Sequence, residues 1–308
     1  PRYGRKGVIL LARVAMEYPN YGWDEAGDDL ENRFDRTYLG PWNNRHPHYR
    51  WKQGGMVTDL IWETFCLEAL AYAYDGLWAY MDQDADLLAF LRRQGLPVAS
   101  ANDLRQYIET YILRAGMRAL QAGWIRGNEG FHQAAALAVA LVLDDVSDRR
   151  PNSLDMVTYA YHGQGRAVDI MRNGLLPDGG GHESPNYSLI KLDFIRVSRL
   201  MEAFRQRHPE LLPVARYPDL FADPKARALF DYYIDVLASD GFYPSVGDCG
   251  GLRDMRRRTT PVVSGLTEPN VFAVERYGDP RHARACFDAE GNLRTGRSEE
   301  HTSELQSP

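Results

Sequence analysis

The segment from Phe131 to Leu143 constrains the fold most strongly, because its residues are apolar on almost every side of the helix they predict. Only His132 and Gln133, in the first turn, carry polar side chains. A helix that is apolar all round must be covered on every side by other elements. The chain of 308 residues is long enough to supply that cover. The segment therefore predicts a buried central helix within a layered fold.

Apolar residues recur at helical spacing through most of the chain. Successive antiparallel helices, one apolar and the others amphipathic, fit either a toroid or a helical solenoid. A fixed-period repeat is not found in the sequence, which favours the toroid. We expect a mainly α fold, an incomplete α/α toroid of antiparallel helical hairpins. The other helices are expected over residues 8–16, 57–80, 104–120, 154–171, 189–204 and 226–237.

The pattern changes after Ser239, where a short extended region is expected near the C-terminus over residues 242–246, 262–263 and 271–277. The last residues, RSEEHTSELQSP, resemble a translated sequencing-library adapter, and the chain begins at Pro1 without a methionine. We therefore expect a fragment in three parts. Residues 1–240 form the toroid, 241–296 an irregular or β-rich start of a truncated second region, and 297–308 a non-native tail.

Composition argues against several classes of protein. The net charge of −6 disfavours nucleic acid as the main partner. No apolar run reaches the roughly 18 residues of a membrane span. The three cysteines show neither CxxC spacing nor an even framework, so no metal ligand set, cofactor or disulfide scaffold is expected. Arg126, Arg166, Arg172 and residues 256–258 are candidates for a local basic cleft that binds an acidic sugar, although a solvated surface is the more common explanation of such charges.

The loop before the apolar helix carries the first candidate residues. Asn128 suits the N-cap of a helix, and such a residue can also face a cavity. His132 and Gln133 need polar partners if the helix is buried, so they are either satisfied core groups or the lining of a wet cavity.

The most site-like stretch runs from Asp178 to Tyr187. Three successive glycines allow positive φ and a close approach of the backbone to a ligand, or they form a flexible linker. His182, Glu183, Asn186 and Tyr187 follow at once, which is unusual for a linker. A third loop, residues 241–251, contains Asp248 and is equally consistent with a plain Gly/Pro-rich turn.

In this order, these loops resemble the helical domain of heparinase II/III-like proteins and related alginate lyases. Residues 61–75 resemble the family's early helix, and residues 128–132 its active-site cleft. Residues 183–187 resemble the loop of the catalytic tyrosine, and residues 243–248 the Pro-x-x-Gly-Asp turn. The chain departs from several relatives because Glu129, not a histidine, follows Asn128. Family members also take a histidine from a C-terminal β-domain that this sequence does not include.

The resemblance implies a periplasmic or secreted polysaccharide lyase that cleaves uronic-acid-containing polysaccharide by β-elimination. Such a reaction needs a donor that neutralises charge on the substrate carboxylate, a base for the C5 proton and an acid for the leaving oxygen. The catalytic candidates are Asn128 and His132 for the first task and Tyr187 for proton transfer. The substrate contacts are expected from Gln133, His182, Glu183 and Asp248. Alone, the fragment is expected to lack part of the site.

Two other functions remain open on the same residues. A glycoside hydrolase on an α/α barrel needs two carboxylates, for which Glu183 and Asp248 are candidates and Glu129 a third. A non-catalytic helical carbohydrate-binding scaffold needs no such constellation. A lyase leaves an unsaturated sugar that absorbs ultraviolet light, and a hydrolase does not.

Overall fold

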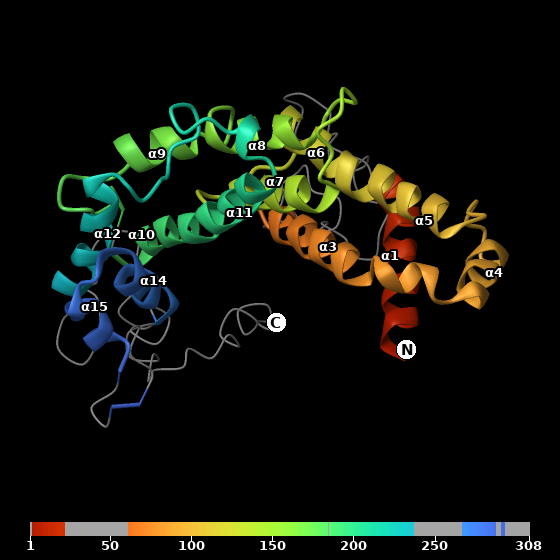
Figure 1. Ribbon diagram of the computed structural model, residues 1–308, viewed down its shortest axis with the longest axis horizontal. Helices are drawn as coiled ribbons and strands as arrows, with labels where there is room; N and C mark the ends of the chain where they lie inside the picture. Colours follow the sequence, from red (N-terminus) through yellow and green to blue (C-terminus); the bar gives the residue numbers. More distant parts are fainter. Residues whose placement is uncertain (1, 22–60, 184, 237–266, 288–290, 293–308) are drawn as a thin grey trace, which may run out of the picture. The chain divides into compact units, whose positions relative to one another are not determined.

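The computed structural model describes residues 2–21, 61–183, 185–236, 267–287 and 291–292, and every element of these residues is a helix (Figure 1). The expected mainly α fold is therefore confirmed. The chain divides into two compact units. The first comprises residues 1–166 and 199–212, and the second residues 167–198 and 213–308. Closure of the helices into a toroid stays a prediction. The expected boundary at residue 240 and the tail over 297–308 lie outside the described residues.

The first unit is built around α7 (Phe131–Leu143), which matches the helix predicted from its apolar sequence. Residues 134–140 have no exposed surface. The helix packs between α3 (Glu63–Leu77) and α8 (Ser153–Tyr161), and α6 (Arg114–Ala122) also contacts it (Figure 1). The prediction of a buried central helix is confirmed.

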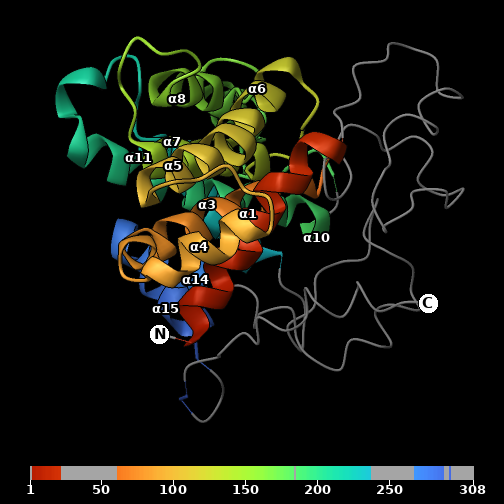
Figure 2. The same cartoon turned by 90° about the vertical axis from the view of Figure 1, so that its right-hand side faces the viewer.

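The remaining helices of the first unit extend this layer. The helix α1 (Arg2–Tyr21) packs against α3 and α5 (Ala101–Ile108), as Figure 2 shows. The segment predicted as a helix over residues 104–120 is one helical run, in which a π-helical turn, η3 (Glu109–Leu113), joins α5 to α6. Ser100 and Asp103 form a capping box that starts this run. The other elements are η2 (Ala79–Asp82), α4 (Ala85–Arg93), the last part of α11 (Phe194–Arg207) and η5 (Pro209–Leu211).

The prediction of a single helix over residues 154–171 is wrong. The chain leaves α8 after Tyr161 and forms α9 (Ala167–Asn173) only after a turn. Gly165 donates its N–H to the Tyr159 carbonyl at 2.9 Å, and a Cβ at Gly165 would collide with that backbone. Arg166 then adopts a left-handed φ of 46°. Glycine supplies the close approach that ends the helix.

The second unit contains α9, α10 (Pro185–Ser188), η4 (Leu189–Asp193), α12 (Pro224–Asp235), α14 (Thr267–Tyr277) and α15 (Pro280–Ala285). The helix α12 contacts α9, α14 and α15 (Figure 1). Aromatic rings fill the contact between α12 and α14: the Phe272 ring centroid lies 4.9 Å from that of Phe221 and 5.9 Å from that of Phe230.

Residues 271–277 were expected to be extended, and that expectation is wrong because they belong to α14. The two valines in this stretch favour a strand locally. The buried positions Asn270 and Ala273 and the half-buried Tyr277 nevertheless follow helical spacing. Packing of this face against α12 overrides the local preference. The other two expected extended pieces, residues 242–246 and 262–263, lie outside the described residues.

In the part of the chain that the structure describes, no helix is both long and apolar enough to cross a membrane.

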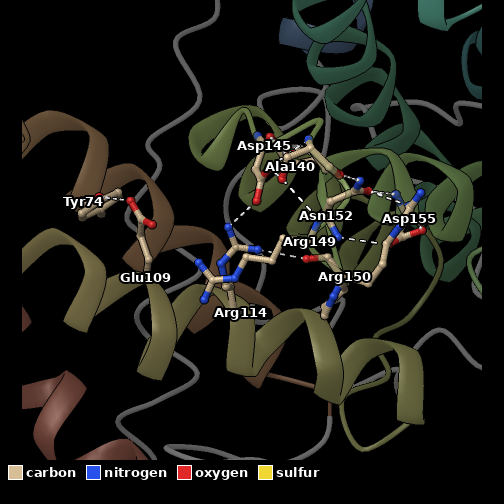
Figure 3. Close-up of polar contacts among 12 residues, drawn as sticks. Tyr74, Glu109, Arg114, Ala140, Asp145, Arg149, Arg150, Asn152 and Asp155 are labelled. Atoms are coloured by element: carbon tan, nitrogen blue, oxygen red, sulfur yellow. Dashed lines mark hydrogen bonds and ion pairs between the residues drawn. The ribbon is translucent and has the colours of Figure 1, made fainter.

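A buried ion pair fastens the C-terminal end of α7 to its neighbours (Figure 3). Arg114, only 5% exposed, pairs with Asp145 and donates to the Pro151 carbonyl at 3.0 Å. Ser153 donates to the Ala140 carbonyl at 2.7 Å and accepts from the Asp145 N–H at 3.0 Å. Burial acts to raise the pKa of Asp145, but hydrogen bonds from Ser147 and Arg114 outweigh it and leave that pKa lowered. The pair therefore holds the α7–α8 connection in place.

Replacing Arg114 should be far more damaging than replacing Arg150, an arginine in the same connection whose side chain is 59% exposed in its pair with Asp155. We expect Arg114→Ala to lower the free energy of unfolding by about 3–5 kcal/mol, because it leaves Asp145 without its partner. Arg150→Ala should cost about 0–1 kcal/mol. Urea denaturation measures both values. Equal losses would show that the buried pair does not fasten this connection.

Candidate functional site

Residues 127–130 form the tight turn that starts α7. A Cβ on Gly127 would lie 2.8 Å from the Phe131 Cβ and 3.0 Å from the Thr64 Cγ2, so the position requires glycine. Gly130 has a φ of 90° and is the residue at the N-cap of α7. These two glycines fix the backbone of the turn and with it the positions of Asn128 and His132.

Asn128 is half-buried and contributes its main chain to the turn. Its carbonyl oxygen accepts hydrogen bonds from the Phe131 N–H at 3.1 Å and from the His132 Nδ1 at 3.2 Å. Gly130 occupies the N-cap, so Asn128 does not have the capping role considered from the sequence. Its side-chain amide finds no hydrogen-bond partner among the described residues. The amide is therefore available to a ligand.

His132 is held in a largely buried position in the first turn of α7. Burial lowers the pKa of His132, and the charge of Arg166 acts in the same direction, while the carbonyls of Asn128, Gly127 and Gln164 oppose them. The imidazole is therefore neutral at pH 7. Because the Asn128 carbonyl only accepts, Nδ1 carries a hydrogen in this contact.

Gln133 was expected to contact substrate, and its environment contradicts this expectation. Its side chain is fully buried. Its Oε1 accepts from the Gly130 N–H at 2.8 Å, and its Nε2 donates to the Gly165 carbonyl at 2.6 Å. The amide thus ties the start of α7 to the turn after α8 and positions the residues around it.

Tyr159 is a candidate that the sequence analysis missed. It is 5% exposed, and its ring meets that of His132 edge-on at 6.1 Å between centroids. Its hydroxyl is buried and has no hydrogen-bond partner among the described residues. Leaving such a group unsatisfied costs about 1–3 kcal/mol. Burial raises the pKa of Tyr159, partly opposed by the charge of Arg126, so the phenol stays protonated and can donate.

Two arginines place positive charge around this group of residues. Arg126 and Arg166 are exposed, and their charges act on Tyr159 and His132 respectively. Both were candidates for a local basic cleft. One unit therefore brings together an amide, a neutral imidazole, a buried phenol and two guanidinium groups, a set suited to an anionic, hydroxyl-rich ligand.

The glycine run 179–181 lies in the second unit and is tightly packed. Gly179 has a φ of 86°, and a Cβ there would collide with the backbone of Ala228 in α12. A Cβ on Gly181 would collide with Ser188 and would lie 3.9 Å from the Lys191 Cε. The flexible-linker alternative is therefore not supported. The run is glycine because α12 and the buried side chains of Ser188 and Lys191 approach it closely.

The residues after the glycines lie at the start of a helical run. His182 and Glu183 are exposed, and Tyr187 is in α10. The side chain of Tyr187 lies outside what the structure describes, as does the whole of Asp248. Lys191, in η4, is 3% exposed, and burial lowers its pKa to about 8, so most molecules carry this charge at pH 7.

The candidate residues thus form two groups. Asn128 and His132 lie together in the first unit with Tyr159, while His182, Glu183 and Tyr187 belong to the second. Each group is described by itself, and their convergence on one substrate stays a prediction.

Comparison of the chain with protein-family models, with curated proteins and with solved structures gives no match.

The packing of the glycine run can be tested against a matched glycine. Gly95 also has a positive φ, 93°, but a Cβ there would meet nothing within 4 Å. We expect Gly95→Ala to cost about 1–2 kcal/mol of backbone strain. Gly179→Ala should cost a further 1–3 kcal/mol, roughly, because α12 must move. Urea denaturation distinguishes the two, and equal losses would mean that the run does not pack against α12.

The protonation of His132 has a measurable consequence. In an NMR titration its ring signals, assigned by their loss in His132→Gln, should change below the ordinary pKa of 6.5. The folded state then binds fewer protons than the unfolded state, so this group makes the protein less stable as pH falls through and below 6.5. A midpoint at or above 6.5 would contradict the buried, neutral imidazole.

Proposed function

We propose that the chain is part of a polysaccharide lyase of the heparinase II/III-like kind, which cleaves uronic-acid-containing polysaccharide by β-elimination. The observation that carries the proposal is the group at the start of α7. The amide of Asn128 has no partner among the described residues, and neutral His132 bonds to the same residue's carbonyl at 3.2 Å. This pairing supports the role that the resemblance implies for Asn128, whereas a neutral His132 is better suited to proton uptake than to neutralising charge.

The first task of the reaction is to stabilise the charge that builds up on the uronate carboxylate when the C5 proton leaves. The Asn128 amide can donate to that carboxylate, and the charges of Arg126 and Arg166 act in the same direction. Donors fixed by a rigid turn need little reorganisation during the reaction. The two glycines of the turn and the fully engaged amide of Gln133 supply that rigidity.

The second task is proton transfer. A neutral imidazole such as His132 can take up a proton at pH 7, whereas an imidazolium cannot. A protonated phenol can deliver a proton to the departing glycosidic oxygen, and Tyr187 is our candidate for this step. Tyr159 is the second phenol to consider, because its raised pKa keeps it a donor. One proton leaves C5, and the electron pair of that C–H bond forms the double bond between C4 and C5. The C4–O bond breaks, and the departing oxygen keeps its electron pair and takes up the delivered proton.

Positively charged side chains in both units support the proposal that the substrate is acidic. In the first unit the charges of Arg126 and Arg166 act on Tyr159 and His132 respectively. In the second unit the buried Lys191 lies beside Gly181. Most molecules carry this positive charge at pH 7, and its place beside a candidate loop is consistent with an anionic ligand.

The two alternatives have less support among the described residues. A hydrolase needs two carboxylates across the scissile bond. Glu129 and Glu183 belong to different units, and Asp248 lies outside the described residues. A non-catalytic scaffold gives no reason for a neutral histidine and an unsatisfied tyrosine to be buried side by side.

The full-length protein should release unsaturated products from a uronic-acid polymer, seen as rising ultraviolet absorbance. Asn128→Ala should reduce the rate about 10²- to 10³-fold because a donor to the developing charge is lost. Tyr187→Phe should reduce it about 10²- to 10⁴-fold because proton transfer is lost. Tyr111→Phe, at a tyrosine that is 38% exposed on η3, is the matched control and should keep the full rate.

Each alternative gives a distinct result in this assay. New reducing ends without absorbance would identify a hydrolase, and saturable binding without any product would identify a scaffold. Either result overturns the lyase proposal, as does the absence of both activity and binding across uronic-acid polymers. Full activity of Tyr187→Phe would transfer the proton-delivery role to another group, with Tyr159→Phe the next variant to measure.

A further inference from the structure

Three side chains of the second unit bring metal-binding atoms together at the contact between α12 and α15, helices that lie side by side in Figure 1. Asp231 comes from α12 and His282 from α15, and Asp279 lies in the turn between α14 and α15. One ligand atom from each of the three lies within 4.8 Å of the others. The positions 231, 279 and 282 follow no metal-motif spacing, so the sequence alone gave no sign of this cluster.

The unusual member of the cluster is His282. Its side chain has 0% exposure, and neither ring nitrogen makes a hydrogen bond to any described residue. Its Nε2 lies 3.4 Å from the Asp231 Oδ1 without the geometry of a hydrogen bond. The ring of Phe230 meets the His282 ring at a steep angle, with 6.1 Å between the two centroids. A fully buried imidazole whose two nitrogens make no hydrogen bond is costly, and this points to a ligand that completes the site.

The geometry suits a small divalent cation. Two ligands that each lie about 2.1 Å from a tetrahedral zinc ion are separated by about 3.4 Å. The Nε2 of His282 and the Oδ1 of Asp231 already have that separation. Imidazole with two carboxylates is an accepted zinc ligand set, in which water completes the coordination. The side chains of Asp231 and Asp279 are 26% and 11% exposed, so solvent reaches the open side of the cluster.

Two arginines now pair with the same carboxylates and would compete with an ion. Arg281 Nη2 lies 2.8 Å from the Asp231 Oδ1 and 2.9 Å from the Asp279 Oδ2, and Arg227 Nη2 lies 3.4 Å from the latter atom. The Arg281 side chain is 50% exposed, so it can swing into solvent when an ion of higher charge takes its place. Its Nη1 is also 3.9 Å from Asp235, a carboxylate that can receive it.

We propose that Asp231, Asp279 and His282 bind a divalent metal ion, with Zn²⁺ the best match, and that Arg281 occupies the carboxylates in its absence. The site is independent of the proposed lyase chemistry. It would fasten α12 to the α14–α15 turn, because its three ligands come from both sides of that contact.

The test is calorimetric titration of the full chain, freed of metal by chelation and dialysis, with Zn²⁺ alone. We expect one saturable site, weakened at least about tenfold in His282→Ala. In Arg281→Gln binding should become tighter, because the competing guanidinium is gone. His208→Ala is the matched control: His208 Nε2 pairs with Asp144 at 2.6 Å in the first unit, in a pair that belongs to no three-residue cluster, and its loss should leave the affinity unchanged.

A second readout keeps the proposal testable if His282→Ala does not fold. Asp279→Asn preserves the side-chain shape, and Co²⁺ bound in place of Zn²⁺ should give a visible absorption band that weakens in this variant. Absence of saturable Zn²⁺ binding by the unmodified chain overturns the proposal and leaves His282 as a plain partner of Asp231. The proposal is also overturned if His208→Ala and His282→Ala lose the same affinity for Zn²⁺, or if Arg281→Gln binds Zn²⁺ more weakly.

Discussion

The burial of residues 134–140, in the middle of α7, is the constraint on which the first unit depends. Residues 134–140 expose no surface, so α3 and α8 must cover them from opposite sides. The ends of α7 are less buried than its middle, and side chains tie each end to a neighbouring segment. Gln133 connects the start of α7 to Gly165, and Ser153 bonds the carbonyl of Ala140 near its end. The polar chemistry of the unit is therefore concentrated at the two ends of its most apolar element.

This arrangement explains why the candidate site lies where it does. The turn of residues 127–130 is rigid because its glycines and Gln133 must fit against α3 and the α8 turn. The same tight packing removes water from His132 and Tyr159, which lowers the pKa of the imidazole and raises that of the phenol. Buried groups with shifted pKa values are common at functional sites, and this supports the role proposed for the two residues. The packing of the first unit and the proposed catalysis thus both depend on the tight packing around the start of α7.

The sequence predicted the features that neighbouring residues determine, and it missed those that depend on contacts with distant parts of the chain. The helix over residues 131–143 was predicted with its correct bounds because almost every residue of the segment is apolar. The partner of Gln133 is 32 positions away, so nothing in its own segment marked it as satisfied. Tyr159 lies within the helix expected over residues 154–171, and nothing in that segment shows that its ring meets His132, which is 27 positions away. Residues 271–277 were misread because their valines favour strands locally, whereas the face packed on α12 has helical spacing.

Tyr159 and His282 share one physical property although they belong to different units. Each is a buried polar side chain without a hydrogen-bond partner among the described residues. Near Tyr159 the charge is that of a guanidinium group, which favours an anionic ligand. Near His282 there are two carboxylates, which favour a cation. A ligand that supplies the missing partner stabilises the folded state. The stabilisation grows with the ratio of the free ligand concentration to the dissociation constant. Substrate and metal should therefore stabilise different parts of the chain, so the two sites can be studied separately.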